Sequence, residues 1–347
     1  MIARDPDAPV LPVRPDFKLE VKAVHSEDQT VAVTLKGFPL FPAVCYRPNG
    51  VDTQQKVFGS AKRVGAVLPP SDPDLRREVA DFALSILPSL SDPLEEEDVK
   101  SFIELLENST IKPQRRKKYI SAYEEFNRGF HNARRRASAF VKAEFYEEDA
   151  KCPRNIAGID IKFTVKYYAL IRSMEKKLFA NPYFIKKVPV AEQPLKIRDE
   201  LGPGPYFVAT DFSSFECSFR PEVMEALECV LYRYMCSRSP WMSDLIEDFI
   251  AAITGPQVCY YPDLKYSVTG TRMSGDICTS LGNGFSNLVM NLFVASKCGA
   301  SIKGFVEGDD GIFSWDVMPD VSYFTRMGFN IKLECYEQPS LASFCTS

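Results

Sequence analysis

Residues 302–315 read Ile-Lys-Gly-Phe-Val-Glu-Gly-Asp-Asp-Gly-Ile-Phe-Ser-Trp, and this stretch decides the fold. Two short apolar runs, 302–306 and 311–315, flank a Gly-Asp-Asp turn. Apolar runs joined by a Gly- and Asp-rich turn are typical of a β-hairpin. The pattern predicts a hairpin with Asp309 and Asp310 at its tip. Because turns favour Asp in any protein, the pair alone says little about function.

A β-prone run at 206–210 precedes the hairpin by about 100 residues and ends at Asp211. Helices are expected from Pro221 to about residue 237 and from the Ser-Gly at 274–275 to about 295, and a further strand near 330–334. This order of strands and helices predicts an α+β fold, a small antiparallel sheet backed by helices. If the strands are neighbours, the carboxylate of Asp211 converges with those at the hairpin tip.

Such a carboxylate cluster has a specific chemistry. Asp211, Asp309 and Asp310 would repel one another, and divalent cations with oxygen ligands are the simplest counter-charge. We therefore predict these three residues as metal ligands for two Mg²⁺ or Mn²⁺ ions. Paired ions of this kind serve phosphoryl and nucleotidyl transfer.

Charge is unevenly distributed along the chain. The 347 residues carry 42 Lys and Arg against 46 Asp and Glu, a net charge of −4. Segment 111–198 alone has 21 basic and 9 acidic residues, a local charge of +12, which leaves −16 for the remainder. A basic block beside an acidic remainder indicates a polyanionic partner such as nucleic acid. Arg134, Arg135 and Arg136 are the predicted RNA contacts, with a solvated helical face as the alternative.

Composition limits the other function classes. A length of 347 residues with 45% hydrophobic residues is typical of a globular protein of about two domains. No apolar run approaches the roughly 20 residues of a membrane span. The ten cysteines are scattered singly and there are only two histidines, which disfavours a zinc site and a Ser-His or Cys-His hydrolase. The cysteines are expected to be reduced core residues of a cytosolic protein.

The N-terminal half is less informative. Residues 1 to about 75 are Pro-rich with short β-like runs such as 31–35, and an amphipathic helix is expected over 75–87. Further helices are expected over 93–107, 113–137 and 163–179.

Six motifs share the order and spacing of one protein family. They are Asp211-Phe-Ser-Ser-Phe-Glu216, Ser274-Gly275-x3-Thr279-x3-Asn283, Gly308-Asp309-Asp310, Phe140-Val-Lys142-Ala-Glu144 with Lys151-Cys-Pro-Arg154, Gly328-Phe-Asn-Ile-Lys332, and Ser343-Phe-Cys345. Together they resemble the RNA-dependent RNA polymerases of positive-strand RNA viruses, closest to the tombusvirus- and nodavirus-like groups. The resemblance covers about 140–345 and implies a right-hand polymerase fold.

The resemblance implies a role for each matched residue. Asp211, Asp309 and Asp310 would be the catalytic metal ligands, and Lys332 the general acid, with a solvated strand-edge lysine as its alternative. Lys142, Lys151 and Arg154 would bind the triphosphate. Ser274, Gly275, Thr279 and Asn283 would bind the nucleotide ribose and the template, with plain helix capping as the alternative for the Ser-Gly pair.

Glu216 departs from the family pattern, which usually has Asp at this nucleotide-binding position. The extra methylene moves the carboxylate outward by about 1.5 Å. Glu216 can still reach Asn283 if the strand end shifts, so we expect ribose selection to survive. The alternative is a solvated residue at a strand–helix junction.

The resemblance also implies an organisation. Residues 1–110 would be an N-terminal region of the fingers, 111–200 the basic fingers with the triphosphate motif, and 201–347 the palm, with a fingers insertion near 240–271. The thumb is expected to be absent, either because the chain is a fragment or because the thumb is supplied elsewhere.

The implied function is template-directed RNA synthesis in viral replication, with RNA and NTPs as partners. The family also implies other viral replication proteins and membrane-associated complexes in the host cytoplasm, reached through a partner because the sequence has no span of its own. The alternatives are a catalytically silent RNA-binding replication subunit and a two-metal nuclease or reverse transcriptase. The three aspartates argue against the silent subunit, and the Ser-Gly-x3-Thr-x3-Asn motif argues against the last class.

Overall fold

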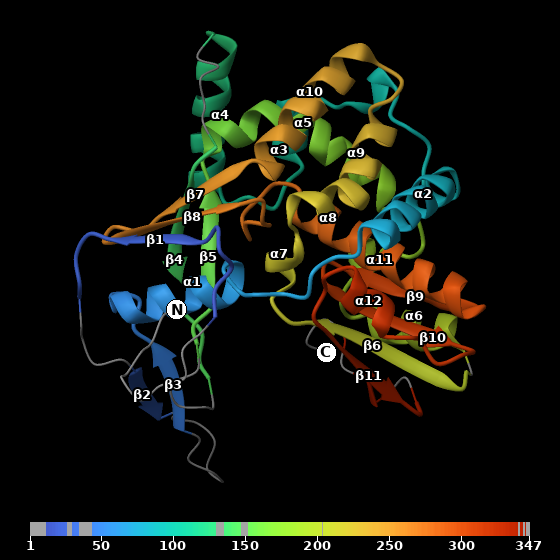
Figure 1. Cartoon of the computed structure of the whole chain (residues 1–347). Helices are drawn as coiled ribbons and strands as arrows, with labels where there is room; N and C mark the ends of the chain where they lie inside the picture. Colours follow the sequence, from blue (N-terminus) through green and yellow to red (C-terminus); the bar gives the residue numbers. More distant parts are fainter. Residues whose placement is uncertain are drawn as a thin grey trace.

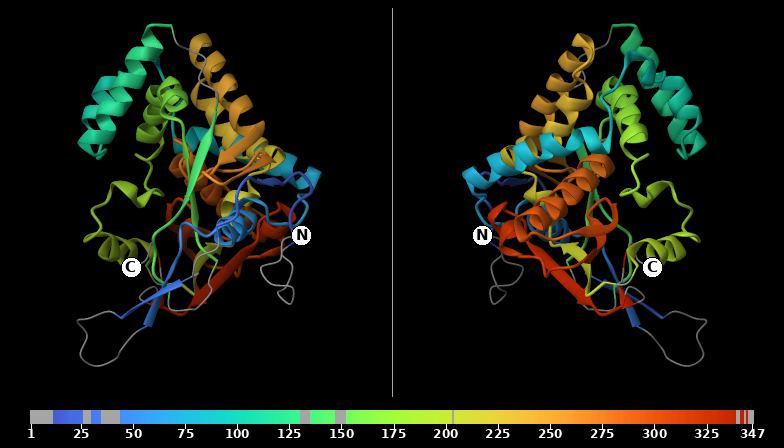
Figure 2. Two further views of the ribbon diagram at one scale, coloured as in Figure 1. Left: turned by 90° about the vertical axis from the view of Figure 1, so that its left-hand side faces the viewer. Right: turned by 90° about the vertical axis from the view of Figure 1, so that its right-hand side faces the viewer.

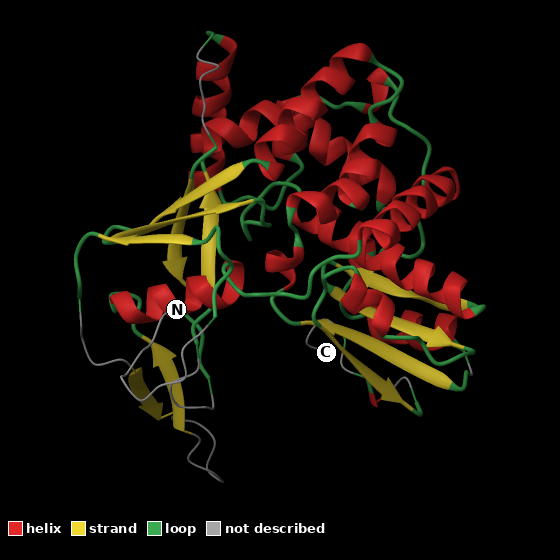
Figure 3. Ribbon diagram, viewed as in Figure 1, coloured by secondary structure: helices red, strands yellow, loops and turns green. Residues whose placement is uncertain are grey.

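The computed structural model describes residues 12–338, apart from 26–29, 35–43, 130–134, 147–151 and 203, together with 341, 342 and 344. These residues form a mixed α+β arrangement, as predicted. In Figures 1 and 3 the two larger sheets lie at the left and at the lower right, and many of the helices fill the upper right.

The first sheet, here the antiparallel sheet, has the strand order β11-β6-β10-β9. Its strands are β6 (Tyr206–Phe212), β9 (Ile302–Glu307), β10 (Asp310–Trp315) and β11 (Ile331–Tyr336). Every pairing in it is antiparallel. The predicted hairpin is β9 and β10, and β6 pairs directly with β10, so the small antiparallel sheet predicted from sequence is confirmed.

Helix α11 (Thr279–Cys298) packs against β9 and β10. Almost all of its residues between 281 and 295 are buried, because helices α2 and α9 cover its other side. The centre of β10 is equally buried, with Ile312 and Phe313 at most 1% exposed. This helix and the sheet therefore form a rigid support under the hairpin tip.

The second sheet, here the mixed sheet, has the strand order β1-β8-β7-β4-β5. Its strands are β1 (Lys18–Val21), β4 (Ala137–Val141), β5 (Asn155–Ile159), β7 (Pro256–Tyr260) and β8 (Leu264–Thr269). Strands β4 and β7 are parallel and the other pairs antiparallel. A separate hairpin of β2 (Thr30–Thr34) and β3 (Val44–Pro48) projects from the body, as both views in Figure 2 show.

The helices surround these sheets. Those before β6 are α1 (Thr53–Val64), α2 (Pro73–Leu90), α3 (Phe102–Glu107), α4 (Pro113–Asn127), α5 (Ile161–Leu178) and α6 (Gln193–Leu201), with the 3₁₀ turns Glu96–Asp98 and Ile185–Lys187. Those after β6 are α7 (Phe215–Ser218), α8 (Pro221–Ala226), α9 (Glu228–Met235), α10 (Pro240–Thr254), α11 and α12 (Ser322–Arg326).

Three helices predicted from sequence differ from the structure. The helix expected from Pro221 to 237 is broken at Leu227, whose backbone leaves the helical region at φ −121° and ψ −93°. The helix expected over 93–107 begins only at α3, because Ser101 caps it by accepting a hydrogen bond from the Glu104 amide.

The basic helix expected over 113–137 ends at Asn127, and residues 137–141 form strand β4 instead. Tertiary pairing explains this strand, since β4 lies between β5 and β7 in the mixed sheet. Alternate residues of β4, Ala137 and Ala139, are buried, which is the period of a strand and not of a helix.

Segment 240–271 forms α10, β7 and β8, and its two strands join the mixed sheet with strands from the first half of the chain. The predicted domain boundaries stay predictions.

Of the helices that the structure describes, none combines the length and the apolar character that crossing a membrane requires.

Candidate active site

Strand pairing places the predicted catalytic residues at one edge of the antiparallel sheet. Thr210 pairs with Gly311, so Asp211 at the end of β6 lies next to the β9–β10 tip. On its other side Asp211 is directly opposite Lys332 of β11. The strands that carry Asp211 and the hairpin tip are neighbours, as the sequence prediction required, whereas the position of Lys332 opposite Asp211 was not predicted.

Helix α11 holds the hairpin tip through hydrogen bonds to its backbone. The side-chain amide of Asn287 donates to the carbonyl oxygens of Asp309, at 3.0 Å, and of Gly308, at 3.4 Å. Gly308 has φ +62°, a left-handed conformation that glycine adopts without a steric penalty. Asn287 was not predicted, although polar residues at 283, 287 and 291 form a four-residue repeat along an otherwise apolar helix, and that repeat is a usable signal.

Asp309 has an unusual electrostatic setting. Water reaches its side chain, but protein surrounds the carboxyl on its other sides. This partial desolvation raises its pKa to about 6, and the negative charges of Glu216 and Asp310 add to the rise. The positive charge of Arg63 opposes this rise only in part.

A cavity of about 450 Å³ opens at this edge. It brings together carboxylates and cations from distant parts of the chain. Its charged lining residues are Lys62, Arg63, Arg154, Asp211, Glu216 and Asp309. Asp310, the first residue of β10, and Lys332 do not line it. Lys332 lies on the edge strand, where a hydrogen bond from its ammonium to Glu334 raises its pKa, and Asp211 contributes less.

The expected contact between Glu216 and Asn283 is wrong in this structure. The Glu216 carboxylate pairs instead with Arg63 of α1. Asn283 is buried and accepts a 3.1 Å hydrogen bond from the Nε of Arg272. The two residues are linked only indirectly, because the Arg272 backbone amide donates to the Glu216 carbonyl at 3.1 Å.

Arg272 is the centre of a buried network that sequence reasoning missed. Its guanidinium pairs with Glu228, both side chains 0% exposed, and contacts Cys278 Sγ at 2.9 Å. It also lies 4.5 Å from the centre of the Phe219 ring. This network joins α9, the 271–278 loop and α11. No local spacing in the sequence pairs a residue of this loop with one on α9.

The Ser274-Gly275 loop is docked onto strand β5. The hydroxyl of Ser274 accepts from the Ala157 amide at 2.9 Å, and the Gly275 amide donates to the Ala157 carbonyl at 2.8 Å. A Cβ on Gly275 would lie 2.5 Å from that carbonyl oxygen, so only glycine fits. Thr279 opens α11 and its hydroxyl donates to the Met273 carbonyl at 3.2 Å. The loop therefore connects the two sheets.

Two of the predicted triphosphate-binding residues, Lys142 and Arg154, form ion pairs with the same carboxylate. Glu144 pairs with both Arg154 and Lys142. Burial opposes ionisation of Glu144, but the hydrogen bonds and charges of Arg154 and Lys142 outweigh it and lower its pKa to about 2. Arg154 lines the cavity and Lys142 does not. Lys151 lies outside the described residues.

The arginine run divides into different environments. Arg134 lies outside the described residues. Arg135 forms a buried ion pair with Asp276, with side chains 7% and 2% exposed, so it does not fit the predicted contact with RNA and instead anchors the 271–278 loop. Arg136 is exposed and faces a second cavity.

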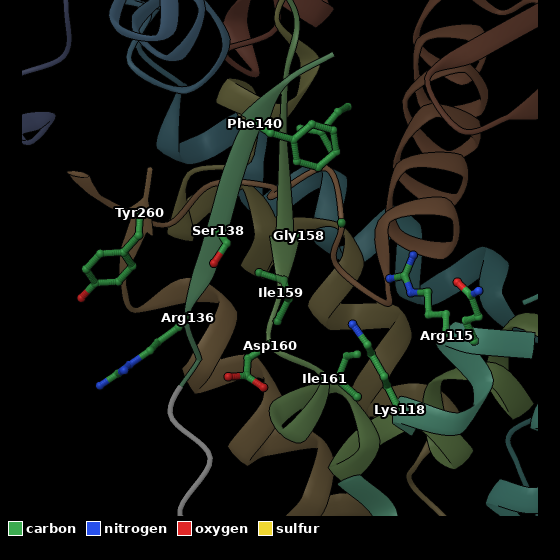
Figure 4. Close-up of a pocket in the computed structure, with 13 residues that line it drawn as sticks. Arg115, Lys118, Arg136, Ser138, Phe140, Gly158, Ile159, Asp160, Ile161 and Tyr260 are labelled. Carbon is green, nitrogen blue, oxygen red and sulfur yellow. The ribbon is translucent and has the colours of Figure 1, made fainter. Parts of the chain in front are cut away.

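That second cavity, here the basic groove, has a volume of about 1020 Å³. Figure 4 shows Arg136, Ser138 and Phe140 along strand β4, with Arg115 and Lys118 of α4 on one side and Tyr260 on the other. Phe140 is 57% exposed, so its ring is available for stacking. Within the described residues none of the three cations forms an ion pair. Gly275 lines the groove, which therefore reaches the loop of the active site.

Carboxylates are suitable ligands for a divalent cation, but of the three predicted ligands only Asp211 and Asp309 line the cavity. Asp211 and Asp309 offer carboxylate oxygens in one cavity, and such oxygens are the ligands that Mg²⁺ prefers. Among the described residues, no three His, Cys, Asp or Glu side chains are grouped closely enough to hold a metal ion. Asp310 begins β10 and does not line the cavity that Asp211 and Asp309 share, and the three-aspartate metal site stays a prediction.

Comparison with known proteins identifies the family. The family model described as "Viral RNA-dependent RNA polymerase" matches residues 144–333. The chain belongs to this family. The match begins at Glu144 and ends in β11, so it contains Asp211, Glu216 and the β9–β10 hairpin, whereas Lys62 and Arg63 of the cavity lie before it.

Two curated relatives of this polymerase family are similar to the chain. The RNA-directed RNA polymerase of Pothos latent virus is 26% identical over 224 residues, which are 56% of this chain and 28% of the relative. That of Groundnut rosette virus is 26% identical over 221 residues, 57% of this chain and 26% of the relative. The chain thus spans about a quarter of the length of these relatives, and both come from plant viruses.

Proposed function

We propose that this chain catalyses template-directed addition of ribonucleotides to an RNA 3′ hydroxyl. The observation that carries the proposal is the cavity in which Asp211 and Asp309 face Arg63 and Arg154. Carboxylates opposite arginines suit a metal–triphosphate substrate, because guanidinium groups bind phosphate oxygens in pairs. Membership of the polymerase family supports the same reaction.

Within this proposal each residue has a defined task. Asp211 and Asp309 would hold divalent cations, Mg²⁺ or Mn²⁺, which would activate the attacking oxygen and stabilise the leaving one. Arg154 binds the triphosphate once Glu144 releases it. Lys332 is the proposed proton donor to the leaving pyrophosphate, and Asn287 keeps Asp309 in place through its backbone.

We assign the antiparallel sheet and α11 to the palm, and the mixed sheet with α4 and α5 to the fingers. Segment 240–271 then belongs to the fingers, since its strands pair with β1 and β4. The basic groove is the proposed path of the template strand. Action in membrane-associated complexes of the host cytoplasm rests on the family alone and stays a prediction.

Primer extension tests the reaction. The full chain is incubated with an RNA primer annealed to a longer template, with Mg²⁺ and four NTPs. We expect products extended to the template end, and omission of one NTP should stop synthesis at the first position that requires it. Untemplated addition would contradict the proposal, and tight RNA binding with no extension would favour the silent RNA-binding subunit.

The basic groove gives a separate prediction on RNA affinity. Arg115→Ala and Lys118→Ala should each weaken binding of single-stranded RNA and flatten the log–log salt dependence by about 0.7, because each phosphate contact releases counterions. Phe140→Ala should weaken binding by about 1–3 kcal/mol with little change in the salt slope, since it removes stacking. The measurement is fluorescence anisotropy at several salt concentrations.

The matched control is Arg77→Ala on helix α2, whose side chain is 78% exposed and pairs with Asp74. It should leave both RNA affinity and salt slope unchanged. If Arg77→Ala and Arg115→Ala lowered RNA affinity equally, binding would depend on the net charge of the chain. The basic groove would then not be the RNA-binding site.

A further inference from the structure

The C-terminal end of helix α1 is docked onto the segment that follows Asp211. Ser214 donates its hydroxyl to the Lys62 carbonyl at 3.0 Å, and the Cys217 thiol donates to the Val64 carbonyl at 3.3 Å. These contacts hold Arg63 beside Glu216, and the two side chains form an ion pair that is 23% and 13% exposed. A residue more than 150 positions upstream thus enters the active site.

Arg63 is only partly satisfied by this pair. A guanidinium carries five N–H donors, and Glu216 occupies one nitrogen, Nη2. The Nε of Arg63 is buried and has no hydrogen-bond partner among the described residues. Arg63 also lines the cavity together with Lys62 and Arg154. Its donors are therefore arranged for a larger anion than one carboxylate.

Glu216 has a length that makes this pair possible. An aspartate at the same position would draw the carboxylate back by about 1.5 Å, the length of one C–C bond. Glu216, which stands where the family usually has Asp, is thus long enough to reach Arg63. In the same structure Asn283, its expected partner, is bound to Arg272.

We propose that Arg63 is a nucleotide-binding residue that exchanges Glu216 for the incoming triphosphate. In the free enzyme Arg63 holds Glu216 away from the ribose position. A triphosphate offers several charged oxygens to the guanidinium fork, so it displaces the single carboxylate. The released Glu216 then turns to the ribose, and sugar selection begins only once a triphosphate is bound. This inference rests on the proposed function of the cavity.

Equilibrium binding of inorganic tripolyphosphate and of ATP tests the exchange without requiring catalysis. Arg63→Met should weaken binding of both about tenfold to a hundredfold, because a charge-assisted contact is lost. Arg63→Lys should fall between, since it keeps the charge but not the fork. Arg77→Met, on the exposed face of α2, is the matched control and should change nothing.

Glu216 variants separate exchange from a simple charge effect. Glu216→Gln should bind tripolyphosphate more tightly than the natural chain, because Arg63 no longer has a competing partner. Glu216→Asp should also bind it more tightly, although it keeps the negative charge, because it is too short to hold Arg63. In the Arg63→Met background both gains should vanish, as expected of two coupled residues.

The outcomes distinguish this inference from the proposed function. If the Glu216 variants still bind tripolyphosphate more tightly in the Arg63→Met background, the gain comes from the general charge of the site. That result would overturn the exchange. Primer extension by Arg63→Met with an unchanged KM for NTP would overturn it while leaving the polymerase assignment intact. Coupled binding in a chain that never extends a primer would keep the exchange and overturn the polymerase assignment. A thermal melt of each variant verifies that it is folded.

Discussion

Asp309→Ala should abolish nucleotide incorporation, by at least about a thousandfold, without lowering the melting temperature. The loss follows because metal-assisted charge stabilisation contributes several kcal/mol, and each 1.36 kcal/mol is tenfold in rate. The fold should survive because Asp309 is exposed at the hairpin tip, where truncation leaves no cavity. Its backbone contact with Asn287 is unaffected by the change.

The pH dependence of stability gives a second readout on the same variant. The folded-state pKa of Asp309 is raised from 3.8 to about 6, so its ionisation is less favourable in the folded chain. The contribution of Asp309 to the stability of the natural chain therefore falls as the pH rises from about 4 to 6. Asp309→Ala lacks this loss, and its melting temperature at pH 7 should equal or exceed that of the natural chain in metal-free buffer.

Primer extension with Mg²⁺ and a thermal melt at pH 4 and pH 7 provide the measurements. Asp244→Ala, an exposed acid on α10, is the control and should retain full activity. Retained activity in Asp309→Ala would remove its assignment as a metal ligand. A lower melting temperature with partial activity would indicate a structural residue instead.

Arg272→Met should produce the largest loss of stability, about 3–5 kcal/mol. Removing one partner of a buried ion pair leaves the other charge uncompensated, and Glu228 is 0% exposed. The same change frees Asn283, so residual activity at low temperature should show poorer nucleotide binding.

Urea unfolding measures the loss, and a second substitution identifies its origin. The double variant Arg272→Met with Glu228→Gln should recover part of the stability, because the buried charge is gone. Arg233→Met breaks exposed ion pairs with Glu225 and Glu247 and should cost below about 1 kcal/mol. Equal losses at Arg233 and Arg272 would contradict the importance of burial.

Periodicity and turn chemistry were sufficient to predict the antiparallel sheet. Gly308 with the two aspartates marks the hairpin, and the apolar run before Asp211 marks β6, because both signals are local. The β4 strand was not predictable in this way, since the partners that make it a strand, β5 and β7, are brought to it only by the tertiary fold.

The same distinction holds for the site. Asp211 and Asp309 were found from their positions at strand ends, which local sequence reveals. Arg63 and Arg272 were not, because their partners Glu216 and Glu228 lie far away along the chain or on another element. Arg135 was misjudged for a related reason: a basic run indicates charge, but only the fold shows that Asp276 covers one member of it.

The mixed sheet has a consequence for the order in which the protein is made. Lys18 of β1 pairs with Ser267 of β8, so β1 can pair with β8 only after about 250 further residues have been synthesised. At roughly 5–20 residues per second, about 250 residues of synthesis take some 12–50 s. During that time β1 lacks β8, the strand that pairs with it in the folded chain. Strands with unpaired edges are exposed to aggregation, so slowed translation before β8 should lower the soluble yield.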